Sequence, residues 1–550
     1  MRHGGKILAD QLAKLGTRRV FSVPGESFLA ALDGLYDSGI QNIVCRHEGG
    51  AAMMAEAYGK MTGTPGIAFV TRGPGATNAS SGVHVARQDS TPMILFIGQI
   101  ARDHRDREVF QEVDYRAMFG PLAKWVAEID QTDRIPEYIA RAWHVATSGR
   151  PGPVVLALPE DMLSDQADVP DLRITAALPD MDLSAQAQRA ADWITAAQSP
   201  LIVVGGPHWS TDAAAALGQF ALAAQVPVAS SFRRQDYLDN RHPAWAGDLN
   251  VAMNPKLAAR VAQADRILVL GSRFGDIATR GFELADPVRQ QQAMFHIHAD
   301  VQELGHIWQP DHAVCARADA FAIALSQATI KPHASAAMEQ AHAAYLAWAT
   351  PVATPGEVRQ EEVIGWLTAH LPEDAIMTNG AGNYAAFLHR YYQFKTFGTQ
   401  LAPTSGSMGY GFPAAVSASL EYPDKTVVCM AGDGCIQMTL NEMSTAVQYG
   451  AHPIVIVVNN GQYGTIRMHQ ERHYTGRVSG TRLANPDYAA LARAYGGHGE
   501  TVIAQDDFVP AFARAKAAGT LAVIELRVNP EALTTGQTLS QIRAASNPKG

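Results

Sequence analysis

Cysteine is scarce in this sequence. Four residues, Cys45, Cys315, Cys429 and Cys435, are scattered over 550 positions, and no two of them form a CxxC pair. This number and this spacing exclude a disulfide framework. They indicate free thiols and a reducing compartment, so we expect a cytoplasmic protein.

Long hydrophobic runs and basic runs are also missing. The longest apolar stretches, PMILFIG and PIVIVV, fall far below the ~20 residues that a membrane-spanning helix needs. The first residues lack the apolar segment and cleavage site of a secretory signal. With a net charge of −9 and no Lys/Arg clusters, the chain is not expected to bind a nucleic acid or a membrane.

The sequence does contain short apolar runs that alternate with helical patterns. Runs such as GIAFV, RILVL and PIVIVV are apolar at consecutive positions, as are strands buried on both faces of a parallel sheet. This alternation predicts an α/β fold of three doubly wound parallel-sheet domains. Looser stretches separate the three expected domains, at residues 1–165, 185–330 and 357–550.

Two glycine-containing turns in the third block carry the strongest chemical signal. AGDGCIQ (431–437) follows one apolar run and VVNNGQYG (457–464) ends the next, with a predicted helix to Gly450 between them. Asp433 and Asn460, 27 residues apart, should therefore meet at one carboxyl edge of a parallel sheet. Glycines and free N–H groups favour a phosphate there, and a carboxylate beside a phosphate requires a cation, most simply Mg²⁺.

Either motif alone would be interpreted as a common Asp/Gly or Asn-Gly turn in a loop that binds no ligand. Together, GDG followed by NN after one helix and one strand resembles the thiamine-diphosphate-dependent enzymes. The resemblance implies that Asp433, Asn460 and the Gln462 carbonyl hold Mg²⁺ on the diphosphate of the cofactor. It also places at the cofactor Asn379, Gly380, Gly432, Gly434, Cys435, Tyr463 and Gly464. We expect Cys435 to pack beside the loop rather than to react.

The first block contains a matching glutamate. Glu48, in CRHEGGAAMM, stands where the family places the carboxylate that bonds the far ring nitrogen of the aminopyrimidine and drives its imino tautomer. Alone, Glu48 would be a helix N-terminal acid favoured by the helix dipole. The neighbouring segments SVPGE, with Pro24, and TRGPGATN, with Asn78, match the pyrimidine-binding domain of the family and favour the catalytic role.

Within this family, the sequence resembles the acetohydroxyacid (acetolactate) synthase branch. FQEVDY contains Gln111, which the resemblance places near the reacting centre. TSGSMGYGFPAA contains Met408 as the apolar wedge that holds the cofactor bent, and the Gly406 carbonyl would accept from the exocyclic amine. Core filling is the alternative for Met408. The three blocks would be a pyrimidine-binding domain, a nucleotide-binding-like domain, functional or vestigial, and a diphosphate/Mg²⁺-binding domain.

The branch implies that a 2-oxo acid loses carbon dioxide and that the resulting enamine is joined to an acceptor carbonyl. The site would lie at the subunit interface of a homodimer or homotetramer. His469 departs from the branch, because it replaces a tryptophan that shapes the acceptor pocket. With Arg467 and His473 it suits an acidic or phosphorylated acceptor, unless these side chains are simply solvated. A simple 2-oxo acid decarboxylase or a C–C lyase, acting on a CoA- or phosphate-bearing substrate, is the alternative.

The sequence of the central block does not determine which ligand, if any, it binds. VLGSRFGD and HIHADVQELG resemble the flavin domain of the branch, but SSFRRQDY replaces a glycine-rich flavin loop. FAD, a coenzyme A tail and an empty site remain alternatives, and Arg233 and Arg234 would bind a nucleotide diphosphate or be solvated. His296 and His298 share one strand face, where packed histidines are favoured over a metal pair.

Two other function classes compete with thiamine chemistry. The first is a nicotinamide-dependent oxidoreductase, but the sequence has no GxGxxG that opens a helix after a strand with an acid about 20 residues on. The second is a non-catalytic homologue, which is disfavoured because Glu48, Asp433 and Asn460 are all present.

Overall fold

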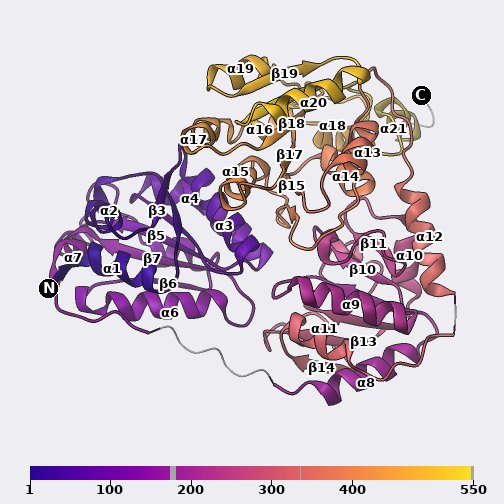
Figure 1. Ribbon diagram of the computed structural model, residues 1–550, viewed down its shortest axis with the longest axis horizontal. Coiled ribbons are helices and arrows are strands. Elements are labelled where there is room, and N and C mark those ends of the chain that lie inside the picture. The colour runs from indigo at the N-terminus through magenta and orange to yellow at the C-terminus, as the bar shows by residue number, and fades with distance from the viewer. Residues whose placement is uncertain (174–180, 335, 547–550) are drawn as a thin grey trace.

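The computed structural model describes residues 1–173, 181–334 and 336–546. It has three parallel six-stranded sheets, one in each part of the chain, and a short two-stranded sheet that pairs β1 (Arg2–His3) with β8 (Gln166–Ala167) (Figure 1). The predicted α/β class with three parallel-sheet domains is therefore confirmed. In the part of the chain that the structure describes, no helix has the length and apolarity to span a bilayer.

The first sheet has the strand order β3-β2-β4-β5-β7-β6. Its strands are almost entirely apolar because α3 and α4 cover one face while α1 and α6 cover the other. The strands are β2 (Arg19–Ser22), β3 (Gln41–Val44), β4 (Gly66–Val70), β5 (Met93–Gln99), β6 (Trp125–Glu128) and β7 (Pro153–Pro159). The helices are α1 (Gly4–Lys14), α2 (Leu29–Tyr36), α3 (Glu48–Thr62), α4 (Pro74–Asp89), α5 (Tyr115–Phe119), α6 (Ile135–Thr147) and α7 (Glu160–Ser164).

The central sheet has the order β11-β10-β9-β12-β13-β14. Helices α8, α9 and α11 cover one face and α10 packs on the other. The strands are β9 (Pro200–Val204), β10 (Val228–Ser231), β11 (Trp245–Leu249), β12 (Arg266–Leu270), β13 (Ala293–His298) and β14 (His312–Cys315). The helices are α8 (Ser184–Thr195), α9 (Thr211–Ala224), α10 (Pro255–Gln263) and α11 (Ala318–Ser326), and α12 (Ala337–Ala349) follows towards the third domain.

The third sheet has the order β16-β15-β17-β18-β20-β19. Helices α13, α14 and α20 cover one face, and α15, α17 and α19 cover the other. The strands are β15 (Ile376–Asn379), β16 (Gln400–Leu401), β17 (Val427–Gly432), β18 (Ile454–Asn459), β19 (His498–Val502) and β20 (Ala522–Arg527). The helices are α13 (Gln360–His370), α14 (Asn383–Tyr391), α15 (Gly411–Glu421), α16 (Asp433–Ile436), α17 (Met443–Tyr449), α18 (Gly464–His473), α19 (Tyr488–Ala494), α20 (Phe508–Ala517) and α21 (Leu539–Ser546).

The helix predicted between the two glycine turns is broken. The segment forms α16, a 3-10 turn at Leu440–Glu442 and then α17, which ends at Gly450 as predicted. The break occurs because Thr439 leaves helical geometry and its hydroxyl donates to the Gly409 carbonyl at 2.8 Å. A tertiary hydrogen bond thus overrides the local helical pattern.

The first and third domains share one apolar core. Helix α3 of the first domain and α15 of the third lie side by side (Figure 1), and Met54, Phe412 and Val416 belong to the same buried cluster. The continuous core fixes the first and third domains relative to each other, since closely packed interiors resist displacement.

Candidate functional site

A cavity of about 230 Å³ opens at the carboxyl edge of the third sheet. The strand order reverses there between β15 and β17, which is where ligands bind in doubly wound sheets. Gly432 of β17 pairs with Val458 of β18, so Asp433 and Asn460 emerge at the same edge, as their spacing predicts. The predicted cofactor residues that line the cavity are Gly406, Met408, Gly432, Asp433, Gly434, Cys435, Asn460, Gln462, Tyr463 and Gly464.

Asp433 is held in place by donors on both of its carboxylate oxygens. Oδ1 accepts from the Gly434 amide, and Oδ2 accepts from the Gly461 amide and from the Asn485 side chain, each at 2.8 Å. Burial raises the pKa of this carboxyl, whereas the hydrogen bonds oppose the rise. The side chain is thus oriented before any cation arrives. Sequence reasoning missed Asn485, because an Asn-Pro pair in a loop gives no chemical signal.

The donor set at this edge fits Mg²⁺ and a diphosphate. Asp433 offers a carboxylate oxygen, Asn460 an amide oxygen and Gln462 a main-chain carbonyl, all hard oxygen ligands of the kind that Mg²⁺ prefers. The Asn460 oxygen is oriented by the Gln462 amide, which donates to it at 3.1 Å. The described residues therefore match the chemistry that the two glycine turns predict.

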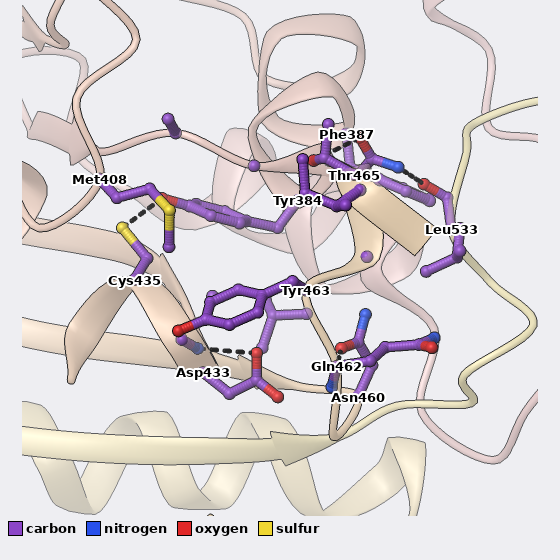
Figure 2. Close-up of a pocket in the computed structure, with 18 of the residues that line it drawn as sticks. Tyr384, Phe387, Met408, Asp433, Cys435, Asn460, Gln462, Tyr463, Thr465 and Leu533 are labelled. Carbon is purple, nitrogen blue, oxygen red and sulfur yellow. Dashed lines mark hydrogen bonds between the residues drawn. The ribbon is translucent and has the colours of Figure 1, made fainter. Parts of the chain in front are cut away.

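Met408 and Cys435 border one side of the cavity, while Leu533 lies at the opposite side (Figure 2). Met408 packs partly on the core of the third domain and also lines the cavity. The Cys435 sulfur accepts from the Gly409 amide at 3.1 Å and from the Tyr384 hydroxyl at 3.3 Å. Cys435 thus packs within the loop, as expected.

Two predicted cofactor residues lie behind the cavity wall. Asn379 is fully buried at the end of β15, and its amide donates to the Gly380 carbonyl at 2.8 Å. Neither Asn379 nor Gly380 lines the cavity; the next residues of the loop, 381–384, do. Asn379 and Gly380 therefore stay predictions as cofactor residues, adjacent in the chain to the lining residues.

The first domain presents a second group of predicted residues at its own strand reversal, between β2 and β4. Glu48 is the first residue of α3, and its Oε2 accepts from the Asn78 side chain at 2.9 Å. Gln111, with a left-handed backbone (φ 66°), packs against Gly73 in the turn after β4. Pro24 follows β2 and is exposed.

These first-domain residues do not meet the cavity of the third domain within one chain. Every residue that lines the cavity lies between Gln360 and Leu533. The side chain of Glu48 contacts Asn78 and the turn at Gly75, which belong to its own domain. A single chain therefore presents two separate groups of predicted site residues, here called half-sites.

Glu442 fixes the start of α3. Its fully buried carboxylate accepts from the amides of Arg46 at 3.1 Å and His47 at 3.0 Å, and from the Thr445 hydroxyl at 2.6 Å. Burial raises the pKa of Glu442, and these donors oppose the rise. The third domain therefore sets where Glu48 begins its helix, which sequence reasoning did not anticipate.

The basic residues predicted to cluster on α18 are only partly exposed. Arg467 is 6% exposed and forms an ion pair with the buried Glu471, which also accepts from Arg543 of α21 at 2.8 Å. His469 and His473 are exposed and stacked, with ring centroids 6.1 Å apart. Burial and the neighbouring Arg472 and His473 lower the pKa of His469. The alternative that Arg467 is solvated is therefore wrong, because its partner Glu471 links it to the C-terminal helix α21.

The C-terminal segment begins at the cavity wall and continues onto α18. Leu533 lines the cavity, and its carbonyl accepts from the Asn383 side chain at 2.8 Å. Leu539 and Ile542 then pack with Met468 of α18 in a small apolar cluster. The described part of the tail thus forms one wall of the site.

The central domain has a crevice at its strand reversal, between β9 and β12, that encloses about 140 Å³. Ser90 and Thr404 from the neighbouring domains form part of its wall, together with Arg234 of the predicted arginine pair.

The paired arginines and histidines of this domain are packed inside the protein. Arg233 and Arg234 are 4% and 6% exposed, so the alternative that they are solvated is wrong, whereas Arg234 lines the crevice of this domain. Arg234 pairs with Asp89 of the first domain at 3.3 Å. His296 and His298 are both buried, with His296 Nε2 2.9 Å from the Ser272 carbonyl oxygen, as expected for packed strand histidines.

Comparisons with known proteins identify the family of the chain. Three thiamine pyrophosphate enzyme domains match the chain: the N-terminal TPP binding domain over residues 2–118, the central domain over 187–325 and the C-terminal TPP binding domain over 380–526. The acetolactate synthase large subunit of Parasynechococcus marenigrum is 31% identical over 520 residues, which cover 90% of this chain and 82% of that protein.

Two further relatives give the same result. The acetolactate synthase large subunit of Lactococcus lactis is 31% identical over 90% of this chain and 87% of its own length. The isozyme 2 large subunit of Escherichia coli is 28% identical, with coverage of 92% and 91%. The chain therefore belongs to the thiamine pyrophosphate enzyme family, in its acetolactate synthase-like branch.

This membership fixes the class of the protein. It is a thiamine-diphosphate-dependent enzyme of the transferase or lyase kind, with Mg²⁺ as the usual partner of the cofactor in this family. The nicotinamide-dependent oxidoreductase and the non-catalytic homologue are thereby set aside.

Proposed function

We propose that this enzyme decarboxylates a 2-oxo acid and joins the remaining carbon unit to an acceptor carbonyl. The observation that supports this best is the gathering of Met408, Asp433 and Asn460 in one cavity of a chain similar to acetolactate synthases over 90% of its length. Bound thiamine diphosphate would supply the electron sink for the carbon from which carbon dioxide departs.

The third domain would bind the cofactor. Asp433, Asn460 and the Gln462 carbonyl would hold Mg²⁺, while the glycine turn at Gly432 and Gly434 lets the backbone approach the diphosphate. The remaining contacts would come from the lining residues Cys435, Tyr463, Gly464 and 381–384. Met408 would support the bent cofactor, and the Gly406 carbonyl would accept from its exocyclic amine.

The first domain would supply the acid–base group. Glu48 would hold a proton at the ring nitrogen of the aminopyrimidine, since a positioned carboxylate is needed to move that proton. The 2.9 Å hydrogen bond from Asn78 keeps Glu48 in one orientation. Gln111 and Pro24, beside the same turn region, would border the reacting centre.

A second copy of the chain would complete each site. The two half-sites are separate within one chain, and a symmetric dimer would bring the first domain of one copy to the third domain of the other. We therefore propose a homodimer, or a homotetramer made of two such dimers.

The acceptor side of the site sets the choice between carboligation and simple decarboxylation. His469 lies exposed on α18, one turn after Ile466, which lines the cavity. The lowered pKa of His469 keeps the ring neutral near pH 7, so it would donate a hydrogen bond to the acceptor rather than supply a charge. This polar group in the expected acceptor pocket favours a polar acceptor and keeps the decarboxylase or lyase alternative open.

A panel of 2-oxo acids, assayed with and without an acceptor aldehyde or 2-oxo acid, separates these reactions. We expect carbon dioxide release to depend on the acceptor and to match the yield of a carboligation product. Release of carbon dioxide and free aldehyde at a rate indifferent to the acceptor would instead identify a simple decarboxylase.

Substitution of His469 tests its proposed role in the same assay. In His469→Ala we expect a changed choice of acceptor while carbon dioxide release from the preferred 2-oxo acid is retained. His473→Ala is the matched control, because it removes the stacked neighbour on the next helical turn. Equal effects of the two substitutions would contradict a specific role for His469.

A further inference from the structure

The cavity assigned to the cofactor has no cation in its wall. Among the described residues that line it, none is Lys, Arg or His. A diphosphate brings several negative charges and Asp433 adds one, so a divalent metal ion neutralises only part of the total. Because charges interact strongly in a site that excludes water, a further positive charge nearby would favour binding.

A buried arginine of the central domain lies directly behind this cavity. Arg233 follows β10 and contacts Gly380, the residue after the end of β15. Its guanidinium donates to the Gly380 carbonyl at 2.8 Å and to the Pro403 carbonyl. Gly380 immediately precedes the lining residues 381–384, and Pro403 precedes the loop that contains Gly406 and Met408.

Among the described residues, no carboxylate forms a direct ion pair with Arg233. Asp89 is near enough to stabilise its charge, but the ion pairs of Asp89 are with Lys60 at 3.1 Å and Arg234 at 3.3 Å. Glu56, in the same network, is paired with Lys60 at 3.2 Å. Lys60 and Arg234 thus hold Asp89 and Glu56, whereas the guanidinium of Arg233 is bonded to main-chain carbonyls rather than directly to an acid.

Several features show that this position is unfavourable in the protein alone. Burial lowers the pKa of Arg233 to about 10. Its backbone has a φ of 61°, a left-handed conformation that a non-glycine residue rarely adopts, and its Nε has no hydrogen-bond partner. Buried charges in proteins are normally paired. A group kept in spite of such costs points to a counter-charge that arrives with a ligand.

We propose that Arg233 supplies the positive charge that balances the diphosphate of the bound cofactor and, through the carbonyls of Gly380 and Pro403, positions the two loops that enclose it. Arg233 is a positioning residue, because it acts through those loops and from behind the cavity wall. The inference rests on the proposed diphosphate site. It gives the central domain a part in cofactor binding that needs no nucleotide in the crevice of that domain.

Calorimetric titration of the cofactor-free full-length protein with thiamine diphosphate and Mg²⁺ tests the proposal. We expect Arg233→Met to weaken binding by about 10–100-fold, as is typical when an outer-shell partner is lost. Arg233→Lys keeps the charge and should retain most of the affinity, whereas Arg233→Gln should resemble the methionine variant. Arg260→Met is the control, because Arg260 is a half-buried arginine of the same domain that lines neither the cavity nor the two loops.

The outcomes distinguish a failure of the role proposed for Arg233 from a failure of the proposed diphosphate site. Wild-type affinity in Arg233→Met, or equal losses in the lysine and glutamine variants, would overturn the role of the charge. If the methionine variant does not fold, the comparison of lysine with glutamine still decides. Failure of the wild-type protein to bind thiamine diphosphate would instead overturn the diphosphate site itself.

Discussion

Replacing Asp433 by alanine is expected to abolish Mg²⁺-dependent binding of thiamine diphosphate. The carboxylate is the only acidic group in the cavity wall among the described residues, and three donors hold it at 2.8 Å. Without it, the metal ion loses its charged protein ligand and the diphosphate loses the ion that anchors it. The loss of affinity should exceed the roughly 10–100-fold that removal of an outer-shell partner produces.

Calorimetry with and without Mg²⁺ measures this effect. Asp424→Ala is a matched control, because Asp424 is exposed and precedes β17 at the opposite edge of the same sheet. Asn485→Ala should give an intermediate loss, since Asn485 orients Asp433 without lining the cavity. Wild-type affinity in Asp433→Ala would remove the metal site from the third domain.

Replacing Glu48 by glutamine is expected to leave cofactor binding nearly intact and to lower turnover by about 10²–10⁴-fold, the usual contribution of a positioned acid–base group. The amide keeps the shape of the side chain and its hydrogen bond with Asn78 but cannot take up a proton. Exchange of the thiazolium C2 proton, followed by NMR on the bound cofactor, should slow together with turnover.

The helix start that carries Glu48 should survive this substitution, because His47 caps α3 and Glu442 binds the amides of Arg46 and His47. Glu137→Gln serves as the control, since Glu137 is exposed on α6 at the other face of the same sheet. Unchanged C2 exchange in Glu48→Gln, with the cofactor bound, would show that Glu48 is not the acid–base group.

The spacing of the two glycine turns was sufficient to predict that Asp433 and Asn460 lie together at one edge of the third sheet. Parallel strands deliver the residues that follow them to one edge, so Asp433 after β17 and Asn460 after β18 had to meet. The fold class was equally accessible, because consecutive apolar residues reveal strands buried on both faces. Both inferences depend on patterns within short segments of the sequence, which can be recognised without knowledge of the fold.

The features of the fold and the site that the sequence did not predict depend on contacts between segments that are distant in the chain. The helix after Cys435 breaks because Thr439 bonds to Gly409, and no local pattern records that contact. Arg467 and Arg233 look like surface cations until their partners, Glu471 and the Gly380 carbonyl, are known. Charged residues are usually exposed, so the sequence alone favours the wrong assignment at such positions.

The central claim is that Glu48 of one chain and Asp433 of another act on the same cofactor. A heterodimer purified from co-expressed, differently tagged Glu48→Gln and Asp433→Ala chains tests it most directly. One of its two sites would combine two wild-type residues and the other would combine both substitutions, so we expect about half of the wild-type activity from a symmetric pair. A heterodimer as inactive as its two parents would contradict the account, because sites formed within single chains would each contain one substitution.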